Sequence, residues 1–125
     1  MVSRTKITGD RGEAIAVEYL RRRGFLICDR NWRCGRYEID IVATRAGVTH
    51  LVEVKTRAAG ALVSPEAAVT PSKAAALRRA AEAYLAQRHV TGEVEFDLVA
   101  VDIFPDGEYE VRYCLLYTSD AADDR

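Results

Sequence analysis

The chain has 125 residues, of which 49% are hydrophobic and 30% are charged, and its formal net charge is −1. This length allows one domain with a single modest core and is too short for two domains. No apolar run approaches the roughly 20 residues of a membrane-spanning helix, and the near-neutral charge means that nucleic-acid binding must come from a local basic patch.

The N-terminal residues contain no apolar segment of the kind found in secretory signal peptides, so we expect a cytoplasmic protein. Three cysteines in no metal-ligand spacing then predict reduced thiols and not a disulfide scaffold. Cys28 and Cys34 are expected to be small, buried or half-buried apolar residues.

Residues 8–23 have the periodicity of a helix that ends at Gly24, a residue type favoured directly after helices. Glu13 lies four and seven positions before Val17 and Leu20, so it projects from the apolar face. A carboxylate in that place needs a metal, a cation or a proton as its partner. The alternative is an acid of the first turn that is favoured by the helix dipole and reaches water.

A strand is expected at residues 25–33, followed by the two strands of a hairpin at about residues 38–43 and 49–56. Side chains alternate between the two faces of a strand. Ile39 and Ile41 are therefore expected on one side of the first hairpin strand, and Glu38 and Asp40 on the other.

The turn of this hairpin decides where Asp40 lies. A loop with an even number of residues, centred between Ala46 and Gly47, places Asp40 directly opposite Glu53, with Cβ atoms roughly 5 Å apart. An odd loop without a bulge places the two carboxylates on opposite faces. Lys55 shares the side of Glu53, so the even loop gathers two acids and an ammonium in one small patch.

The second half of the chain predicts a helix and a closing strand. Thr70 followed by Pro71 is typical of a helix start, with Thr as the N-cap, and the helix is expected to run to residue 88. Residues 93–103 alternate and are rich in β-branched residues, as in a strand. The order αβββαβ predicts one α/β domain with a mixed sheet flanked by two helices.

A few single residues also carry expectations. Trp32, at the end of a strand, is expected to anchor the edge of the core, with stacking on nucleic acid as the alternative. His50 and His89 are expected at the surface and not as ligands. Asp97 and Asp102 are expected at strand ends, in ion pairs.

The last residues, 114–125, read CLLYTSDAADDR, which one reading frame of a common transposase sequencing adapter encodes. We therefore predict a native domain of residues 1–113 followed by a non-native tail that adds no core contacts. A natural disordered acidic tail is the alternative. Without the three aspartates and one arginine of this segment, the formal net charge changes from −1 to +1.

The hairpin acids suit a metal ion. Asp40, Glu53 and the backbone carbonyl of Val54 offer the oxygen ligands that Mg²⁺ prefers. Such an ion polarises a phosphoryl oxygen and lowers the pKa of a bound water. Lys55 would hold that water or neutralise the phosphate. The structural alternative is a half-exposed hairpin face with cross-strand ion pairs, which contribute little to stability.

Six short motifs occur in order along the chain: G-x-x-x-A-x-x-Y-L-x-x-x-G-F from Gly12, N-W-R at 31–33, E-I-D-I at 38–41, V-E-V-K-T-R at 52–57, A-V-T-P-x-K at 68–73 and F-D-L-V-A-V-D at 96–102. Together they resemble the YraN family, small bacterial proteins of the PD-(D/E)XK nuclease superfamily. The resemblance spans Gly9 to Ile103. It implies a restriction-endonuclease-like fold, similar in its core to archaeal Holliday-junction resolvases.

The same resemblance implies catalytic residues. These are Glu13, Asp40, Glu53 and Lys55, with the three acids binding Mg²⁺ or Mn²⁺. The family usually has a glycine where this chain has Tyr37, so the entry into that strand is expected to differ.

Three basic residues, Arg33, Arg57 and Lys73, are the expected nucleic-acid contacts. After T-P the family usually has a run of basic residues, and here only Lys73 remains. Fewer basic side chains are therefore expected to contact phosphates at this place.

We therefore expect a metal-dependent endonuclease that hydrolyses DNA phosphodiester bonds, with structured or branched DNA as its substrate. One alternative is a non-catalytic nucleic-acid-binding or recombination-accessory module that retains the fold. In the other, the acids only make ion pairs. DNA is the expected partner, no membrane partner is expected, and a homodimer is compatible with the sequence.

Overall fold

The computed structural model describes residues 4–59 and 70–120. Its elements are α1 (Arg4–Arg22), β1 (Leu26–Cys34), β2 (Tyr37–Arg45), β3 (Val48–Ala58), α2 (Pro71–Arg88), β4 (Glu93–Ile103) and β5 (Tyr109–Asp120). The strands form one sheet in the order β1-β2-β3-β4-β5, in which only β3 and β4 are parallel. The predicted α/β class and αβββαβ core are confirmed, and β5 extends that core.

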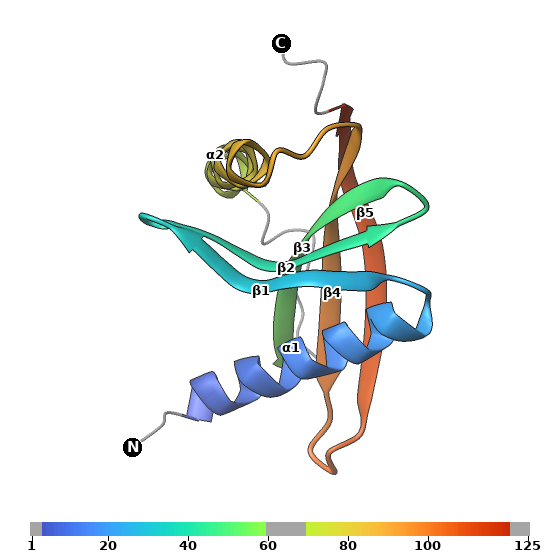
Figure 1. Cartoon of the computed structure of the whole chain (residues 1–125). Helices are drawn as coiled ribbons and strands as arrows, with labels where there is room; N and C mark the ends of the chain where they lie inside the picture. The colour runs from blue at the N-terminus through green and yellow to red at the C-terminus, as the bar shows by residue number, and fades with distance from the viewer. Residues whose placement is uncertain (1–3, 60–69, 121–125) are drawn as a thin grey trace.

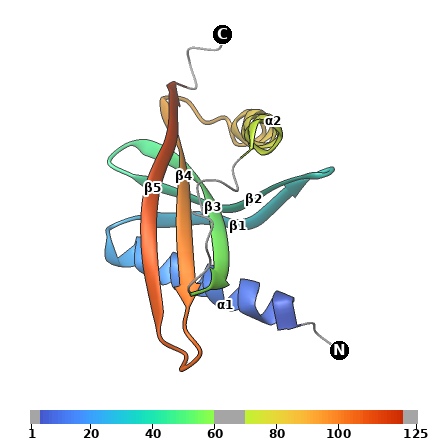
Figure 2. The same cartoon turned by 180° about the vertical axis from the view of Figure 1, so that it is seen from behind.

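The two helices cover opposite faces of the sheet, as Figures 1 and 2 show from the two sides. The core on the α1 face consists of Ala16, Val17, Leu20, Phe25, Ile41, Ala43, Val52, Val99 and Val101. The core on the α2 face consists of Trp32, Ile39, Val42, Leu51, Leu77, Ala80, Ala81, Tyr84, Val94 and Phe96. Because both faces of the central strands are covered, those strands are apolar almost without interruption.

Helix α1 lies very close to β3 at Gly12. A Cβ atom on Gly12 would lie 1.8 Å from Oγ1 of Thr56, so only glycine fits there. Glu13 follows directly and is consequently held against the sheet, with a side chain only 15% exposed. The predicted place of Glu13 beside the apolar face is confirmed.

Strands β2 and β3 form the predicted hairpin with a two-residue loop. Ala46 and Gly47 have φ angles of 51° and 80°, the left-handed conformation that two-residue hairpin loops require. The pairing runs from Arg45 opposite Val48 to Ile41 opposite Val52. The loop therefore has an even number of residues, as in the first alternative, and Asp40 and Glu53 lie one residue beyond the last pair of this ladder.

The alternation along β2 breaks around Asp40. Ile39 packs in the α2-face core and Ile41 in the α1-face core, so the prediction that they share a side is wrong. Asn31, which lies between the β1 partners of these two residues, has a φ of 51°. A left-handed residue in a strand changes its direction locally, and the regular two-residue period is lost there.

Helix α2 begins as predicted. The hydroxyl of Thr70 accepts a hydrogen bond from the backbone N–H of Lys73 at 3.2 Å, and Pro71 is the first helical residue. The helix ends at His89, which has a left-handed φ of 55° and an exposed side chain. No helix in the described part of the chain is long and apolar enough to cross a membrane.

Of two predictions about residues of β1, one is confirmed and one is wrong. Trp32 is buried, packs edge-on against Tyr84 and donates a hydrogen bond to Oε1 of Gln87 at 3.0 Å, which confirms its anchoring role. Cys28 and Cys34 are both exposed, so the prediction of buried thiols is wrong. The reason is that β1 is an edge strand.

The C-terminal segment forms more structure than expected. Strand β5 pairs with β4 from Ile103 opposite Tyr109 to Glu93 opposite Asp120. Leu116 packs against the α2-face core. The expectation that residues 114–125 make no core contacts is therefore wrong for Leu116, whereas residues 121–125 lie outside the described range. The adapter origin of this segment stays a prediction.

Candidate functional site

Asp40 is a half-buried carboxylate at the point where β2 changes direction. Its Oδ2 accepts a hydrogen bond from the backbone N–H of Val54, on the next strand, at 2.8 Å. Burial, followed by the negative charge of Glu53 and more weakly that of Glu13, raises the pKa of Asp40 to about 7. The hydrogen bond from Val54 opposes this rise only in part. The site therefore disfavours a charged Asp40 unless a cation is present.

Glu53 already has a cation beside it. The ammonium Nζ of Lys73 lies 3.0 Å from Oε1 of Glu53, whose side chain is 15% exposed. The hydrogen bond to Glu53 is also the main cause of the raised pKa of Lys73. The capped first turn of α2 thus brings a positive charge onto the acid patch of the hairpin.

Glu13 lies next to this patch and has its own partner. Nη2 of Arg30, on β1, is 3.7 Å from Oε1 of Glu13. The negative charge of Glu13 contributes to the raised pKa of Asp40, so the two carboxylates are electrostatic neighbours. The carboxylates of Glu13, Asp40 and Glu53 do not all come within 4.8 Å of one another, however.

The predicted basic residues have different surroundings. Lys55 is exposed and makes no ion pair with another described residue. Arg33 is exposed, and its Nη2 lies 3.5 Å from Oε2 of Glu38. Arg57 is largely buried and donates a hydrogen bond to Asp102 at 2.8 Å. Arg57 is consequently less accessible to a ligand than the other two.

The donor set around Asp40 fits a hard divalent cation. It contains the carboxylates of Asp40 and Glu53, oxygen ligands of the type that Mg²⁺ and Mn²⁺ take, and the predicted third ligand is the backbone carbonyl of Val54. The ammonium of Lys73 already offsets the charge of Glu53, so a divalent cation at Glu53 would compete with it.

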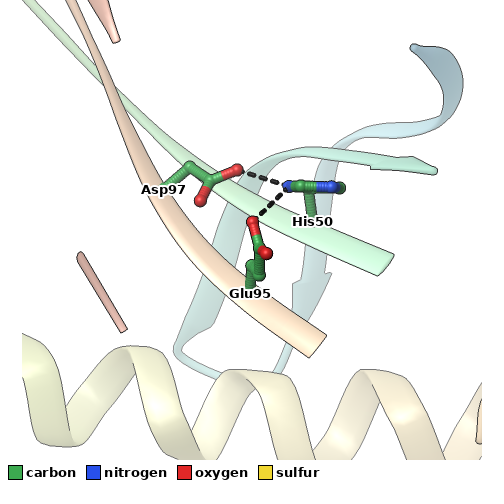
Figure 3. A group of neighbouring side chains, drawn as sticks. All are labelled: His50, Glu95 and Asp97. Atoms are coloured by element: carbon green, nitrogen blue, oxygen red, sulfur yellow. Dashed lines mark hydrogen bonds and ion pairs between the residues drawn. The ribbon is translucent and has the colours of Figure 1, made fainter. Parts of the chain in front are cut away.

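A second cluster lies elsewhere on the sheet and was not predicted. His50 on β3 is buried, and its Nδ1 lies 2.6 Å from Oδ2 of Asp97 and 3.3 Å from Oε2 of Glu95, both on β4 (Figure 3). Tyr113 donates a further hydrogen bond to Oδ2 of Asp97. The expectation that His50 is a surface residue is therefore wrong.

Asp97 is also not at a strand end, as was expected, but buried in the middle of β4. A sequence signal for both residues existed. His50 alternates in phase with the apolar Val52 and Val54, and Asp97 interrupts the apolar run FDLVAV.

Comparison with known proteins gives a consistent result. The model of a family described as "Uncharacterised protein family UPF0102" matches residues 12–101. A UPF0102 protein of Clavibacter michiganensis is 45% identical over 108 residues, covering 85% of this chain and 90% of that protein. One of Streptomyces coelicolor is 50% identical over 97 residues, 74% of each. One of Bacteroides fragilis is 38% identical over 107 residues, 86% of this chain and 88% of that protein.

Proposed function

The chain belongs to the UPF0102 family, and from the chemistry of its hairpin we propose that it is a metal-dependent endonuclease acting on DNA. The observation that carries this proposal is the pair of carboxylates Asp40 and Glu53, which lie one residue beyond the last pair of the β2–β3 ladder, Ile41 with Val52. Burial and then the negative charge of Glu53 raise the pKa of Asp40, so the two acids are electrostatic neighbours. A divalent cation bound between them would offset this repulsion.

In this proposal Asp40, Glu53 and the carbonyl of Val54 hold Mg²⁺ or Mn²⁺, and Glu13 contributes through water. When bound, the ion would supply Lewis-acid polarisation of a phosphodiester and a lowered pKa for the attacking water. Lys55, exposed on the same strand as Glu53, would orient that water and offset the negative charge that develops on the phosphate.

The DNA would lie along the side of the sheet where the β1–β2 hairpin reaches out beyond α2, as seen in both views (Figures 1 and 2). Exposed arginines occupy this hairpin, namely Arg30, Arg33 and Arg36. In this proposal they and Lys73 supply the local basic patch that phosphate binding requires in a nearly neutral chain, and DNA phosphates would compete with Glu13 and Glu38 for Arg30 and Arg33. Since a chromosomal substrate lies in the cytoplasm of a bacterium, cytoplasmic residence is part of this proposal.

One observation favours a second function. Lys73 neutralises Glu53 without any metal, so the site is partly charge-balanced as it stands. A non-catalytic module that binds branched DNA through the same basic patch, and never cleaves it, is the alternative proposal.

A cleavage screen separates the two. Branched, flapped and single-stranded DNA are incubated with the full chain in Mg²⁺ and in Mn²⁺, with Asp40→Asn and Lys55→Ala as test variants and Glu110→Gln, an exposed acid on β5, as the matched control. The endonuclease proposal expects cleavage by wild type and Glu110→Gln, and none by either test variant.

Binding is measured in parallel by gel shift. DNA bound equally by all four proteins and cleaved by none would replace the endonuclease with the binding module. Neither binding nor cleavage would contradict both proposals.

A further inference from the structure

The cluster of His50, Glu95 and Asp97 lies on the α1 face, away from the hairpin acids. His50 is paired with Glu95 across the parallel strands β3 and β4, and Asp97 lies two residues further along β4. Figure 3 shows both carboxylates turned toward the same nitrogen, Nδ1 of His50. His50 and Asp97 are fully enclosed, whereas the side chain of Glu95 is 21% exposed and opens the cluster to solvent.

Neither the charge nor the hydrogen bonding of this cluster is balanced. Two carboxylates face one imidazole, which carries at most one positive charge, so negative charge is in excess. In addition, Oδ1 of Asp97 is buried without any hydrogen-bond partner. Its Oδ2, by contrast, accepts from both His50 and Tyr113. Buried polar atoms without partners are rare and costly, and an ion is one of the recognised explanations for them.

We propose that His50, Glu95 and Asp97 form a binding site for a divalent transition-metal ion of the Zn²⁺ class. Their nearest ligand atoms, one nitrogen and two oxygens, all lie within 4.8 Å of one another, and no other group of three such residues in the described part of the chain meets this condition. An imidazole nitrogen together with carboxylates is a donor set that Zn²⁺ takes, whereas Mg²⁺ prefers oxygen alone.

The spacing requires little rearrangement. Ligands about 2.0–2.2 Å from a tetrahedral ion lie roughly 3.3 Å from each other. The separation of Nδ1 from Oε2 of Glu95 is 3.3 Å, and that from Oδ2 of Asp97 is 2.6 Å, a hydrogen bond. On binding, the ion would take the place of the proton on Nδ1, which leaves to solvent, and Asp97 could use its unpartnered Oδ1. The ion would then link β3 to β4.

This site is separate from the acid patch. Glu53 pairs with Lys73 on α2, whereas His50 contacts Phe25, which belongs to the α1-face core. Three residues of strand, about 10 Å, also separate them along β3. The two sites can therefore be tested independently with different metals.

The test is a titration of the full chain, stripped of metals by a chelator and alkylated at its thiols, with ZnCl₂, CoCl₂ and MgCl₂ in turn. Calorimetry gives affinity and stoichiometry, and visible absorption of Co²⁺ reports on its ligands. Glu95→Gln and His50→Gln are the test variants. The controls are His89→Asn, which removes the other histidine, and Asp40→Asn, which alters only the hairpin site.

We expect one equivalent of Zn²⁺ or Co²⁺ that wild type and both controls bind equally well. Because the hairpin acids can also take these ions, a second equivalent there would be lost in Asp40→Asn and kept in His89→Asn. Affinity should fall at least about tenfold in Glu95→Gln and His50→Gln, because even the loss of an outer-shell partner of a ligand costs that much. Glu95→Gln is the decisive variant, since its partly exposed side chain can change without disturbing the fold. No binding of Zn²⁺ or Co²⁺ by wild type, or undiminished binding by Glu95→Gln, would overturn the proposal, as would an equal loss in His89→Asn.

Discussion

Asp40 has surroundings that differ strongly from those of a free carboxyl. It is half-buried, receives one hydrogen bond from Val54 and faces the charge of Glu53, and its pKa is raised to about 7 from an ordinary value of 3.8. The folded state consequently binds more protons than the unfolded state between pH 4 and pH 7. The stability of the protein should therefore fall as pH rises through this window.

Replacing Asp40 by Asn tests this. Asn cannot ionise but can still accept the hydrogen bond from Val54, so its stability should lack this pH dependence. Without metal, Asp40→Asn and wild type should be similar in stability near pH 4, and the variant should be the more stable by up to a few kcal/mol at pH 8. Urea denaturation at both pH values in EDTA measures this difference. A difference that does not change with pH would show that Asp40 is not the titrating group.

Lys73 competes with any ion that binds Glu53. Its ammonium lies 3.0 Å from Oε1 of Glu53, but the side chain of Lys73 is 48% exposed. An ion pair of this kind stabilises the folded protein by only about 0.2–1 kcal/mol. We expect Lys73→Met to bind Mg²⁺ or Mn²⁺ roughly two- to fivefold more tightly than wild type, because the competing charge has gone. The same variant should bind DNA more weakly, because a phosphate contact has been lost.

Lys55→Met is the matched control for this prediction. It also removes a lysine next to the acids, but one without an ion pair to another described residue, so its metal affinity should change less. Affinities are read from thermal-shift titrations with each metal. Weaker metal binding by Lys73→Met would mean that Lys73 does not occupy the place of the ion.

At the scale of elements, the contact of α1 with β3 sets the position of Glu13. The helix can come this close only because Gly12 has no side chain to meet Thr56. Gly9, one turn earlier on the same helix, is exposed and has no atom within 4 Å of where its Cβ would be. The two glycines are thus in opposite situations, which makes them a matched pair.

Alanine should therefore have opposite effects at these positions. Gly9→Ala should stabilise the protein by about 0.8–1.0 kcal/mol, because alanine is the better helix former. Gly12→Ala should destabilise it, by roughly 1–3 kcal/mol or more, because the added methyl overlaps Thr56 and forces α1 away from the sheet. Thermal denaturation of both variants gives the sign directly, and a stabilised Gly12→Ala protein would contradict the close packing described here.

At the scale of the whole molecule, the sheet extends to the C-terminal segment. Residues of β5 beyond Tyr113 pair with the first half of β4, and Leu116 adds to the α2-face core. This strand also supplies Tyr113, which donates its hydrogen bond to Asp97. The stability of the β4 edge therefore depends on a segment that we predict, from its sequence, to be of adapter origin.

Truncation after Tyr113 distinguishes the two views of this segment. If residues 114–120 are an integral part of β5, their removal should lower the melting temperature by several degrees, because the β4 edge loses its partner and Leu116 its contacts. A melting temperature unchanged within error would support the adapter origin. Direct sequencing of the chromosomal gene across its 3′ end provides an independent control.

Much of the architecture could be predicted from the chain because its signals are local. Each of these signals depends only on residues that are close together in the sequence. They are the helical periodicity up to Gly24, the Thr70-Pro71 start of α2 and the alternation of residues 93–103. The hairpin belongs to this class too. A two-residue loop determines the register of its own strands, so the proximity of Asp40 and Glu53 could be expected from the sequence once the loop was taken to be even.

The partners of the charged residues depended on contacts across the whole chain. Arg30 reaches Glu13 and Lys73 reaches Glu53 only because α1 and α2 pack on opposite faces of one sheet. The local break around Asp40, which separates Ile39 from Ile41, lies beside the left-handed Asn31 on the neighbouring strand β1. A residue pattern that repeats every two or four positions carries no information about such neighbours.

The buried cluster is the clearest example of what tertiary structure alone decided. His50 and Asp97 are 47 residues apart and meet because β3 and β4 pair in parallel. Such pairing is selected by the burial of both faces of the sheet, a property of the complete fold. Local patterns in the sequence therefore predicted the elements up to β4 and the hairpin acids, whereas the packing of the elements brought the titratable groups together and added β5 to the sheet.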